Sequence, residues 1–283
     1  MIPEAVITWL DDNEHGSIIN QQSVAGGCIN NGTRLETSSA ENFFLKSNSS
    51  APQDMFAREA EGLEELRSGV GPRFPKVFLV GADFLLLEDL APASRGPNYW
   101  ETLGRQLAQL HQRTKPQFGF AENNYIGSTP QPNPWTDNGF EFFAEHRLGF
   151  QARLARDNGL LSGKEAAKVD MLCTRLPELL PEEPTSLIHG DLWSGNVISD
   201  SAGQPALIDP AAHFGWRESE LGMTKLFGSF DERCYIAYDE IFPLDSGWKQ
   251  RLPIYNLYHL LNHLNLFGPS YHQQVLDILH RFA

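Results

Sequence analysis

The sequence predicts an α+β fold in two lobes, with a mainly β N-terminal lobe and a mainly α-helical C-terminal lobe. Short apolar runs of strand length concentrate before residue 90, and stretches with helical periodicity dominate after residue 98. The segment between them, 91–98, contains two prolines and a glycine, a composition typical of a linker. A chain of 283 residues is long enough for two tightly joined lobes. We therefore expect an N-terminal lobe over 1–90 and a C-terminal lobe over 91–283.

The N-terminal lobe is predicted to be an antiparallel sheet with one helix. The helix is expected over Gln53–Arg67, where apolar residues recur at steps of three and four. The last two strands are joined by Gly81-Ala82-Asp83, which is a hairpin signal. The expected strands are Ile18–Val24, Thr33–Thr37, Asn42–Lys46, Val77–Val80 and Phe84–Leu87.

The C-terminal lobe is predicted to consist mainly of helices around one strand-like segment. That segment, 185–209, carries most of the polar residues suited to chemistry. The stretch 118–139 is rich in Gly, Pro and Asn, and we expect an ordered loop or a lid there. Helical periodicity predicts helices over 100–112, 140–156, 164–180, 218–230 and from 248 to the end.

Composition excludes several classes of partner. A net charge of −14 argues against nucleic acid, whose phosphates require a basic surface. No apolar run approaches the roughly 20 residues that span a bilayer, so we expect no membrane insertion. The first twelve residues carry acids where a signal peptide carries basic residues, and three cysteines do not suggest a disulfide framework. We therefore expect a cytoplasmic protein.

The segment His189-Gly190-Asp191-Leu192-Trp193-Ser194-Gly195-Asn196 lies between two short apolar runs. Phosphoryl transfer requires a carboxylate that accepts the proton of the attacking hydroxyl and an oxygen ligand nearby for Mg²⁺. The spacing D-x-x-x-x-N supplies both groups from one loop. We expect Asp191 to be the catalytic base and Asn196 to be a metal ligand.

A second carboxylate follows a short predicted hairpin. The apolar stretches 197–198 and 206–208 flank a turn through Asp200 and Gly203, and this hairpin would return Asp209 to the loop. A carboxylate at that place would hold Mg²⁺ against the phosphates of ATP. The loop, the hairpin and the second Asp are together much more specific than a lone turn aspartate, so we predict Asp209 as the other metal ligand.

The N-terminal lobe offers residues for the phosphates of a nucleotide. Gly26 and Gly27 end a predicted strand, where small residues let backbone N–H groups approach phosphate. Lys46 ends another strand, and Glu59 on the next helix is its preferred partner, with Glu61 as the rival. No G-x-x-x-x-G-K-[ST] loop occurs in the chain, which disfavours a P-loop NTPase.

These motifs, taken in order, resemble the fructosamine kinase (ketosamine-3-kinase) family. The resemblance is carried by HGDLWSGN at 189–196, LIDPA at 207–211 and WRESELGMTKLFGSF at 216–230. Further matching segments are GGCIN, FFLKSN, MFAREAEGL, NNYIGSTPQPNPW, FFAEHRL and YNLYHLLNHLNLFG, which span nearly the whole chain. That family belongs to the protein-kinase-like group, together with aminoglycoside phosphotransferases and choline kinases.

The resemblance implies an activity and a set of roles. The family transfers the γ-phosphate of ATP to the sugar 3-hydroxyl of a ketosamine, which destabilises the glycation adduct and frees the amine. By resemblance, Asp191 is the proton acceptor, Lys46 and Glu59 form an ion pair, and Asn196 and Asp209 bind Mg²⁺. The hinge that receives adenine would be Glu88, Asp89 and Leu90.

The sequence leaves alternatives open for the roles of single residues and for the function. Trp193 is expected to contact the acceptor, and the insert Trp193-Ser194-Gly195 argues against an aminoglycoside kinase. His263, on a late helix, is a second candidate for acceptor contact. Cys28 in the glycine segment is either a packing thiol or a redox-sensitive one. The alternatives are a kinase for another small alcohol, of aminoglycoside or choline type, and a nucleotide-binding pseudokinase. The sugar, the amine and the oligomeric state are not determined by the sequence.

Overall fold

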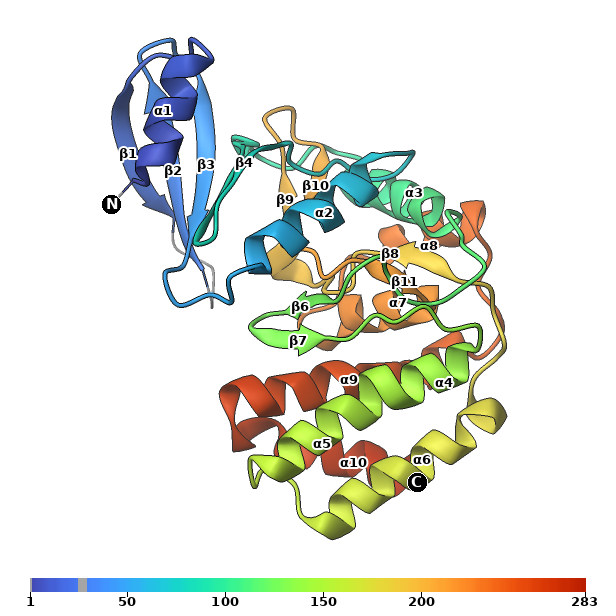
Figure 1. Cartoon of the computed structure of the whole chain (residues 1–283). Helices are drawn as coiled ribbons and strands as arrows, with labels where there is room; N and C mark the ends of the chain where they lie inside the picture. The colour runs from blue at the N-terminus through green and yellow to red at the C-terminus, as the bar shows by residue number, and fades with distance from the viewer. Residues whose placement is uncertain (1, 25–29) are drawn as a thin grey trace.

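The computed structural model describes residues 2–24 and 30–283, and its N-terminal part is built on a five-stranded antiparallel sheet. The strand order is β1-β2-β3-β5-β4. Figure 1 shows this sheet set apart from the helical layers at the C-terminal end of the chain. The strands are β1 (Ile18–Val24), β2 (Asn31–Thr37), β3 (Asn42–Ser47), β4 (Val77–Val80) and β5 (Phe84–Glu88).

The two faces of this sheet pack against different parts of the protein. Successive side chains of a strand point to opposite faces, so Phe43 and Leu45 on β3 share one face while Phe44 and Lys46 share the other. The first face packs against helix α1 (Glu4–Asp12) through the buried side chains of Val6 and Leu10. The second face is therefore the one that carries Lys46 toward the rest of the chain.

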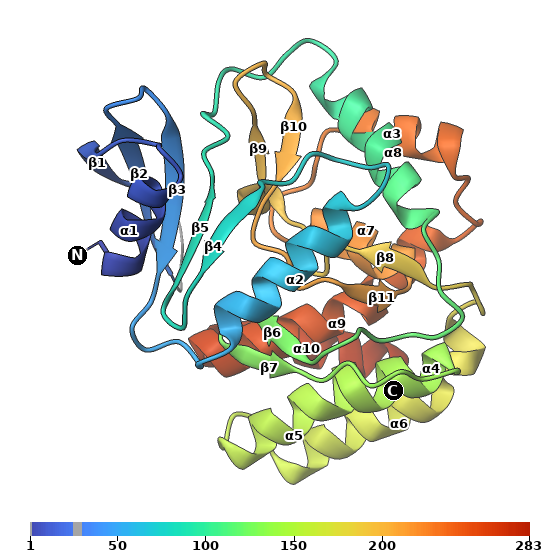
Figure 2. The same cartoon turned by 45° about the horizontal axis from the view of Figure 1, so that its top comes forward.

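Helix α2 (Met55–Arg67) joins the sheet to the C-terminal part. Its buried residues Phe56, Ala60, Leu63 and Leu66 belong to a core cluster that also contains Leu85 of β5 and residues beyond 98. Figure 2 shows α2 lying between β4 and the short strands that follow residue 185. One hydrophobic core thus spans the boundary near residue 90, and the division into lobes at that residue stays a prediction.

The C-terminal part is mainly helical, with three two-stranded sheets. A second core cluster lies among its later helices, at the bottom of Figure 1. None of the described helices is long and apolar enough to cross a bilayer. The helices are α3 (Tyr99–His111), α4 (Gly139–Phe143), α5 (Phe150–Asp157), α6 (Gly163–Leu179), α7 (Arg217–Leu226), α8 (Glu232–Ile241), α9 (Trp248–Phe267) and α10 (His272–Phe282). The strand pairs are β6 (Asn124–Ile126) with β7 (Thr129–Gln131), β8 (Ser186–Ile188) with β11 (His213–Gly215), and β9 (Val197–Ser199) with β10 (Pro205–Leu207).

The structure confirms the predicted order of elements and adds two helices. Helix α1 was not expected, because Val6, Ile7 and Thr8 are β-branched and its Ncap residue, Pro3, makes no side-chain cap. Helix α8 was also missed. The segment predicted as one helix over 140–156 contains a π-helical stretch, Ala144–Gly149, between α4 and α5. The expected loop at 118–139 is ordered and contains the β6–β7 hairpin.

Helices α3 and α8 approach each other closely at Gly104, which predicts a large effect of substitution there on stability. A Cβ added at Gly104 on α3 would lie 2.1 Å from the carbonyl oxygen of Cys234 on α8. We expect Gly104→Ala to lower the free energy of unfolding by roughly 1–3 kcal/mol, the usual cost of overpacking. The matched control is Gly163→Ala at the start of α6, where an added Cβ meets nothing within 4 Å. That variant should be neutral or slightly stabilising. Urea unfolding measures both, and equal effects would contradict the argument.

Candidate active site

Seven of the residues singled out from the sequence line one cavity of about 610 Å³. They come from elements far apart in the chain: strand β3, helix α2, the loop after β8, the residues after β10, and helix α9. The seven residues are Lys46, Glu59, Asp191, Trp193, Asn196, Asp209 and His263.

Lys46 is the cation at the junction of the two parts of the chain. Its Nζ lies 2.6 Å from Glu59 Oε1 and 3.0 Å from Asp209 Oδ1. Burial acts to lower the pKa of Lys46, but the charges of Asp209 and Glu59 outweigh it and raise that pKa above its usual value. The rival carboxylate, Glu61, pairs with Arg58 at 2.8 Å and does not reach Lys46. The structure therefore selects Glu59 as the partner of Lys46.

The loop that carries Asp191 is closed by its own polar groups. Asn196 Nδ2 donates to the backbone oxygen of Asp191 at 2.8 Å and to Asp191 Oδ2 at 3.3 Å. His189 Nε2 lies 2.8 Å from the carbonyl oxygen of Ile208, and its Nδ1 accepts from Asp191 N–H at 3.2 Å. Burial lowers the pKa of His189, so a neutral ring that donates at Nε2 fits both contacts. His189 thus connects the loop to the residue before Asp209.

The predicted hairpin places Asp209 beside this loop. Strands β9 and β10 pair antiparallel, and Ile208 N–H donates to the backbone oxygen of Asn196 at 3.1 Å. Asp209 itself has a left-handed backbone with φ of 58°, an uncommon conformation for a residue other than glycine. Such strain is often kept at functional sites, where the surrounding contacts fix it.

Asp191 has an unusual protonation equilibrium. Burial, followed by the negative charge of Asp209, raises the pKa of Asp191 to about 7, although the Asn196 hydrogen bond acts in the other direction. A carboxyl group with a pKa near the working pH suits a general base. Perturbed carboxylates in a cavity are candidates for functional groups.

A buried carboxylate, that of Glu220, holds the start of the loop through hydrogen bonds to its backbone. Glu220 on α7 accepts hydrogen bonds from the backbone N–H of His189 at 2.9 Å and of Gly190 at 2.7 Å, and His111 Nε2 lies 3.1 Å from the same carboxylate. Gly190 has φ of 83°, and a Cβ there would lie 2.2 Å from the carbonyl oxygen of Ala211. The loop turn therefore requires glycine at 190 and an acceptor at 220.

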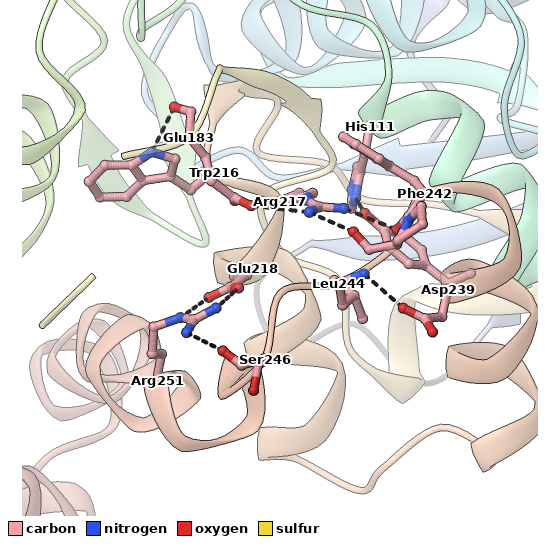
Figure 3. Close-up of polar contacts among 12 residues, drawn as sticks. His111, Glu183, Trp216, Arg217, Glu218, Asp239, Phe242, Leu244, Ser246 and Arg251 are labelled. Carbon is pink, nitrogen blue, oxygen red and sulfur yellow. Dashed lines mark hydrogen bonds and ion pairs between the residues drawn. The ribbon is translucent and has the colours of Figure 1, made fainter. Parts of the chain in front are cut away.

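The helix that carries Glu220 is itself anchored by two arginines (Figure 3). Arg217 donates to the carbonyl oxygens of Phe242 at 3.0 Å and Pro243 at 2.9 Å. Glu218 is fully buried and pairs with Arg251 of α9, with Nε 2.8 Å from Oε2. These residues support the helix behind the loop and are not among the described residues that line the cavity.

The other residues predicted to bind the nucleotide are not among the described residues that line the cavity. Gly26, Gly27 and Cys28 lie outside the described residues. Glu88 forms an ion pair with Arg73, with Oε1 2.6 Å from Nη2, and Asp89 forms an ion pair with Arg34. Leu90 is buried. The described lining of the cavity does not include Glu88, Asp89 or Leu90. A role of this segment in holding adenine therefore stays a prediction.

The two residues predicted to contact the acceptor, Trp193 and His263, both line the cavity. Trp193 packs over Gly195, because a Cβ at that glycine would lie 2.4 Å from the indole ring. His263 on α9 bonds through Nδ1 to the carbonyl oxygen of His259 at 2.8 Å. The W-S-G sequence is thus a packing requirement, in which the glycine leaves room for the indole.

A buried polar network, which the sequence analysis did not identify, holds the β6–β7 segment against the residues after Asp209. Asn124 donates to the carbonyl oxygen of Ala212 at 2.8 Å and accepts from Gln131 and Asn133, each at 2.8 Å. Arg147, fully buried on the π-helical stretch, donates to Asn133 Oδ1 at 2.6 Å. The only sequence signal for these residues was their place in segments that resemble the family.

Two cavity-lining residues on the α2 side were also missed. Tyr125 donates through its hydroxyl to Asp54 at 2.7 Å, and Arg58 is surrounded by Asp54, Glu61 and Glu122. These contacts link the β6 strand to the start of the helix that carries Glu59. Single tyrosines and arginines give no sequence signal of this kind, because only the fold brings them together.

The residues present fit a magnesium ion that a nucleotide helps to hold. Asp209 offers a carboxylate that is 41% exposed, and Asn196 uses its Nδ2 for Asp191, which leaves its Oδ1 without a described partner. Mg²⁺ prefers such oxygen ligands and is usually completed by water and substrate phosphates. In the described part of the chain, no three His, Cys, Asp or Glu side chains gather to hold a metal by themselves.

Comparison with known proteins places the chain among small-molecule kinases. The model of the family described as "Fructosamine kinase" matches residues 3–283. A probable ketoamine kinase from Synechocystis is 42% identical over 93% of this chain and 90% of its own. The chloroplastic protein-ribulosamine 3-kinase of Arabidopsis thaliana is 36% identical over 99% of this chain and 87% of its own.

Solved structures agree with the sequence comparison. A crystal structure described as a putative fructosamine-3-kinase from Thermobifida fusca has a TM-score of 0.89 and 32% identity, covering 99% of this chain and 98% of that one. An aminoglycoside phosphotransferase shares only the fold, with a TM-score of 0.63 at 14% identity over 98% of this chain and 99% of its own. The fold is thus that of the kinase-like phosphotransferases, and the chain belongs to the fructosamine kinase family.

Proposed function

We propose that this protein transfers the γ-phosphoryl group of ATP to the sugar 3-hydroxyl of ketosamines, which promotes deglycation. The observation that carries the proposal is the gathering of Asp191, Asn196, Asp209 and the Lys46–Glu59 pair at one cavity. The family and the relatives named ketoamine kinase and ribulosamine 3-kinase support it. The unpaired thiols of Cys173 and Cys234 agree with a reducing compartment, and we propose the cytoplasm.

Asp191 is the proposed proton acceptor. Its carboxylate would orient the attacking hydroxyl and take its proton as the new bond to phosphorus forms, a role that its pKa of about 7 suits. Lys46, held by Glu59, would contact the nucleotide phosphates. Asn196 and Asp209 would hold Mg²⁺, which when bound neutralises charge on the phosphates. Trp193 and His263 would line the acceptor side.

The first experiment is an ADP-release assay with Mg-ATP. We expect turnover of ribulose-lysine or fructose-lysine and none of kanamycin or choline. Asp191→Asn should lower kcat by at least roughly 100-fold, because general-base catalysis contributes that much, while ATP still binds. Turnover of kanamycin or choline alone would point to another alcohol acceptor. ATP binding without turnover of any acceptor would favour a nucleotide-binding regulator.

The partner of Lys46 gives a second test with an internal control. Glu59→Gln should raise the KM for ATP and lower kcat, because the buried Lys46 loses the carboxylate 2.6 Å away. Glu61→Gln removes a half-exposed carboxylate that pairs with Arg58, and it should change neither constant by more than about twofold. Steady-state kinetics with varied ATP measure both, and an equal effect of the two changes would contradict the assignment.

The brace under the loop gives a third test. Glu220→Gln keeps the shape but replaces one accepting oxygen with a donor, so one of the N–H groups of His189 and Gly190 loses its partner. We expect the free energy of unfolding to fall by roughly 1–3 kcal/mol, the cost of an unsatisfied buried group. Because the turn positions Asp191, kcat should fall more than the KM for ATP changes. If Glu220→Gln changed neither the free energy of unfolding nor kcat, the loop would keep its conformation without the Glu220 hydrogen bonds, and the argument for Glu220 would fail.

A further inference from the structure

Four aromatic rings form a cluster on the acceptor side of the cavity, and the proposed chemistry does not use three of them. The cluster consists of Phe227, His263, Phe267 and Tyr271, all of which line the cavity. The His263 ring centroid lies 4.4 Å from that of Phe227, 5.1 Å from that of Tyr271 and 5.4 Å from that of Phe267. These residues follow α7 or lie at the end of α9 and just beyond it, so only the fold gathers them.

The cluster presents electron-rich surface without a positive charge. Burial lowers the pKa of His263, which favours the neutral ring. Its Nδ1 lies against the carbonyl oxygen of His259, so Nδ1 carries the hydrogen, and no described residue bonds to Nε2. The described cations of the cavity, Lys46 and Arg58, are each paired with carboxylates. Aromatic faces attract cations within about 6 Å, and Nε2 is an acceptor for an N–H donor.

A ketosamine carries a cation close to its reacting hydroxyl. The amine is attached to C1 of the sugar, two carbons from the 3-hydroxyl, and a secondary alkylamine is protonated at neutral pH, as lysine is. Trp193 and the cluster line the same cavity as Asp191. Phe267 lines the cavity and is 47% exposed, which suits an alkyl chain that leaves the cavity with the amine.

We infer that Phe227, His263 and Tyr271 bind the protonated amine of the acceptor, so that the enzyme selects ketosamines by their cation as well as by their sugar. This inference rests on the proposed function. The alkyl arm of the amine would pass over Phe267, and the ammonium would donate to His263 Nε2. The acceptor class is therefore a ketose bearing a charged secondary amine on an aliphatic chain.

The test compares two acceptors that differ in one atom. N-butyl ribulosamine carries the cation, and 1-O-butyl ribulose replaces the amine with a neutral ether of similar shape. We expect kcat/KM of the wild-type enzyme to favour the amine roughly tenfold, as one desolvated contact between a cation and an aromatic ring allows. The assay measures ADP release with Mg-ATP.

Variants at Tyr271 show whether the ring carries the preference. Tyr271→Leu should reduce the amine-to-ether ratio several-fold, whereas Tyr271→Phe keeps a ring and should keep most of the ratio. Phe227→Leu should act like Tyr271→Leu. Melting temperatures and ATP affinity confirm that each variant is folded. The quantity compared is the ratio of kcat/KM for the amine to kcat/KM for the ether within each variant. A general loss of activity lowers both values and leaves this ratio unchanged.

The outcomes separate the inference from the proposed function. Equal kcat/KM for amine and ether in the wild-type enzyme, or a ratio that Tyr271→Leu leaves intact, would overturn the inference while the kinase activity stands. A wild-type enzyme that phosphorylates neither compound nor any other ketosamine would instead refute the proposed function, and the inference with it.

Discussion

The site depends on one buried carboxylate. Glu220 accepts hydrogen bonds from two consecutive backbone N–H groups, those of His189 and Gly190, and from His111. Burial acts to raise the pKa of Glu220, but these hydrogen bonds and the neighbouring histidines lower it overall, so the group stays ionised as an acceptor. Because the next residue is Asp191, the position of the proposed base follows from a helix that does not itself line the cavity.

The second constraint is the alternation of side chains along the sheet. Phe43 and Leu45 are buried under α1, so the period of two along β3 directs Lys46 to the opposite face. There it meets Glu59 of α2 and Asp209 from the C-terminal part. The ion pairs of Lys46 thus join three segments that lie far apart in the sequence, and the cavity forms where these segments meet.

Much of this arrangement could be predicted from local patterns. The D-x-x-x-x-N spacing singled out Asp191 and Asn196, which both line the cavity. The turn signals around Gly203 predicted the hairpin before Asp209, which the structure confirms. The strands and helix α2 followed from periods of two and of three to four residues. The pattern did not find α1, whose β-branched residues form a helix because Val6 and Leu10 pack against the sheet. Nor did it find α8, which packs closely on α3 at Gly104.

The sequence by itself predicted the base and the metal ligands, because Asp191, Asn196 and Asp209 lie close together in the chain and their spacing carries the signal. Only the tertiary structure decided between Glu59 and Glu61, since both lie on one helix and the choice depends on which side chain reaches Lys46. It also decided which aromatic residues line the cavity, where Phe227 and Tyr271 come together from different elements. Contacts between distant segments arise from packing of whole elements, and local sequence patterns do not encode them.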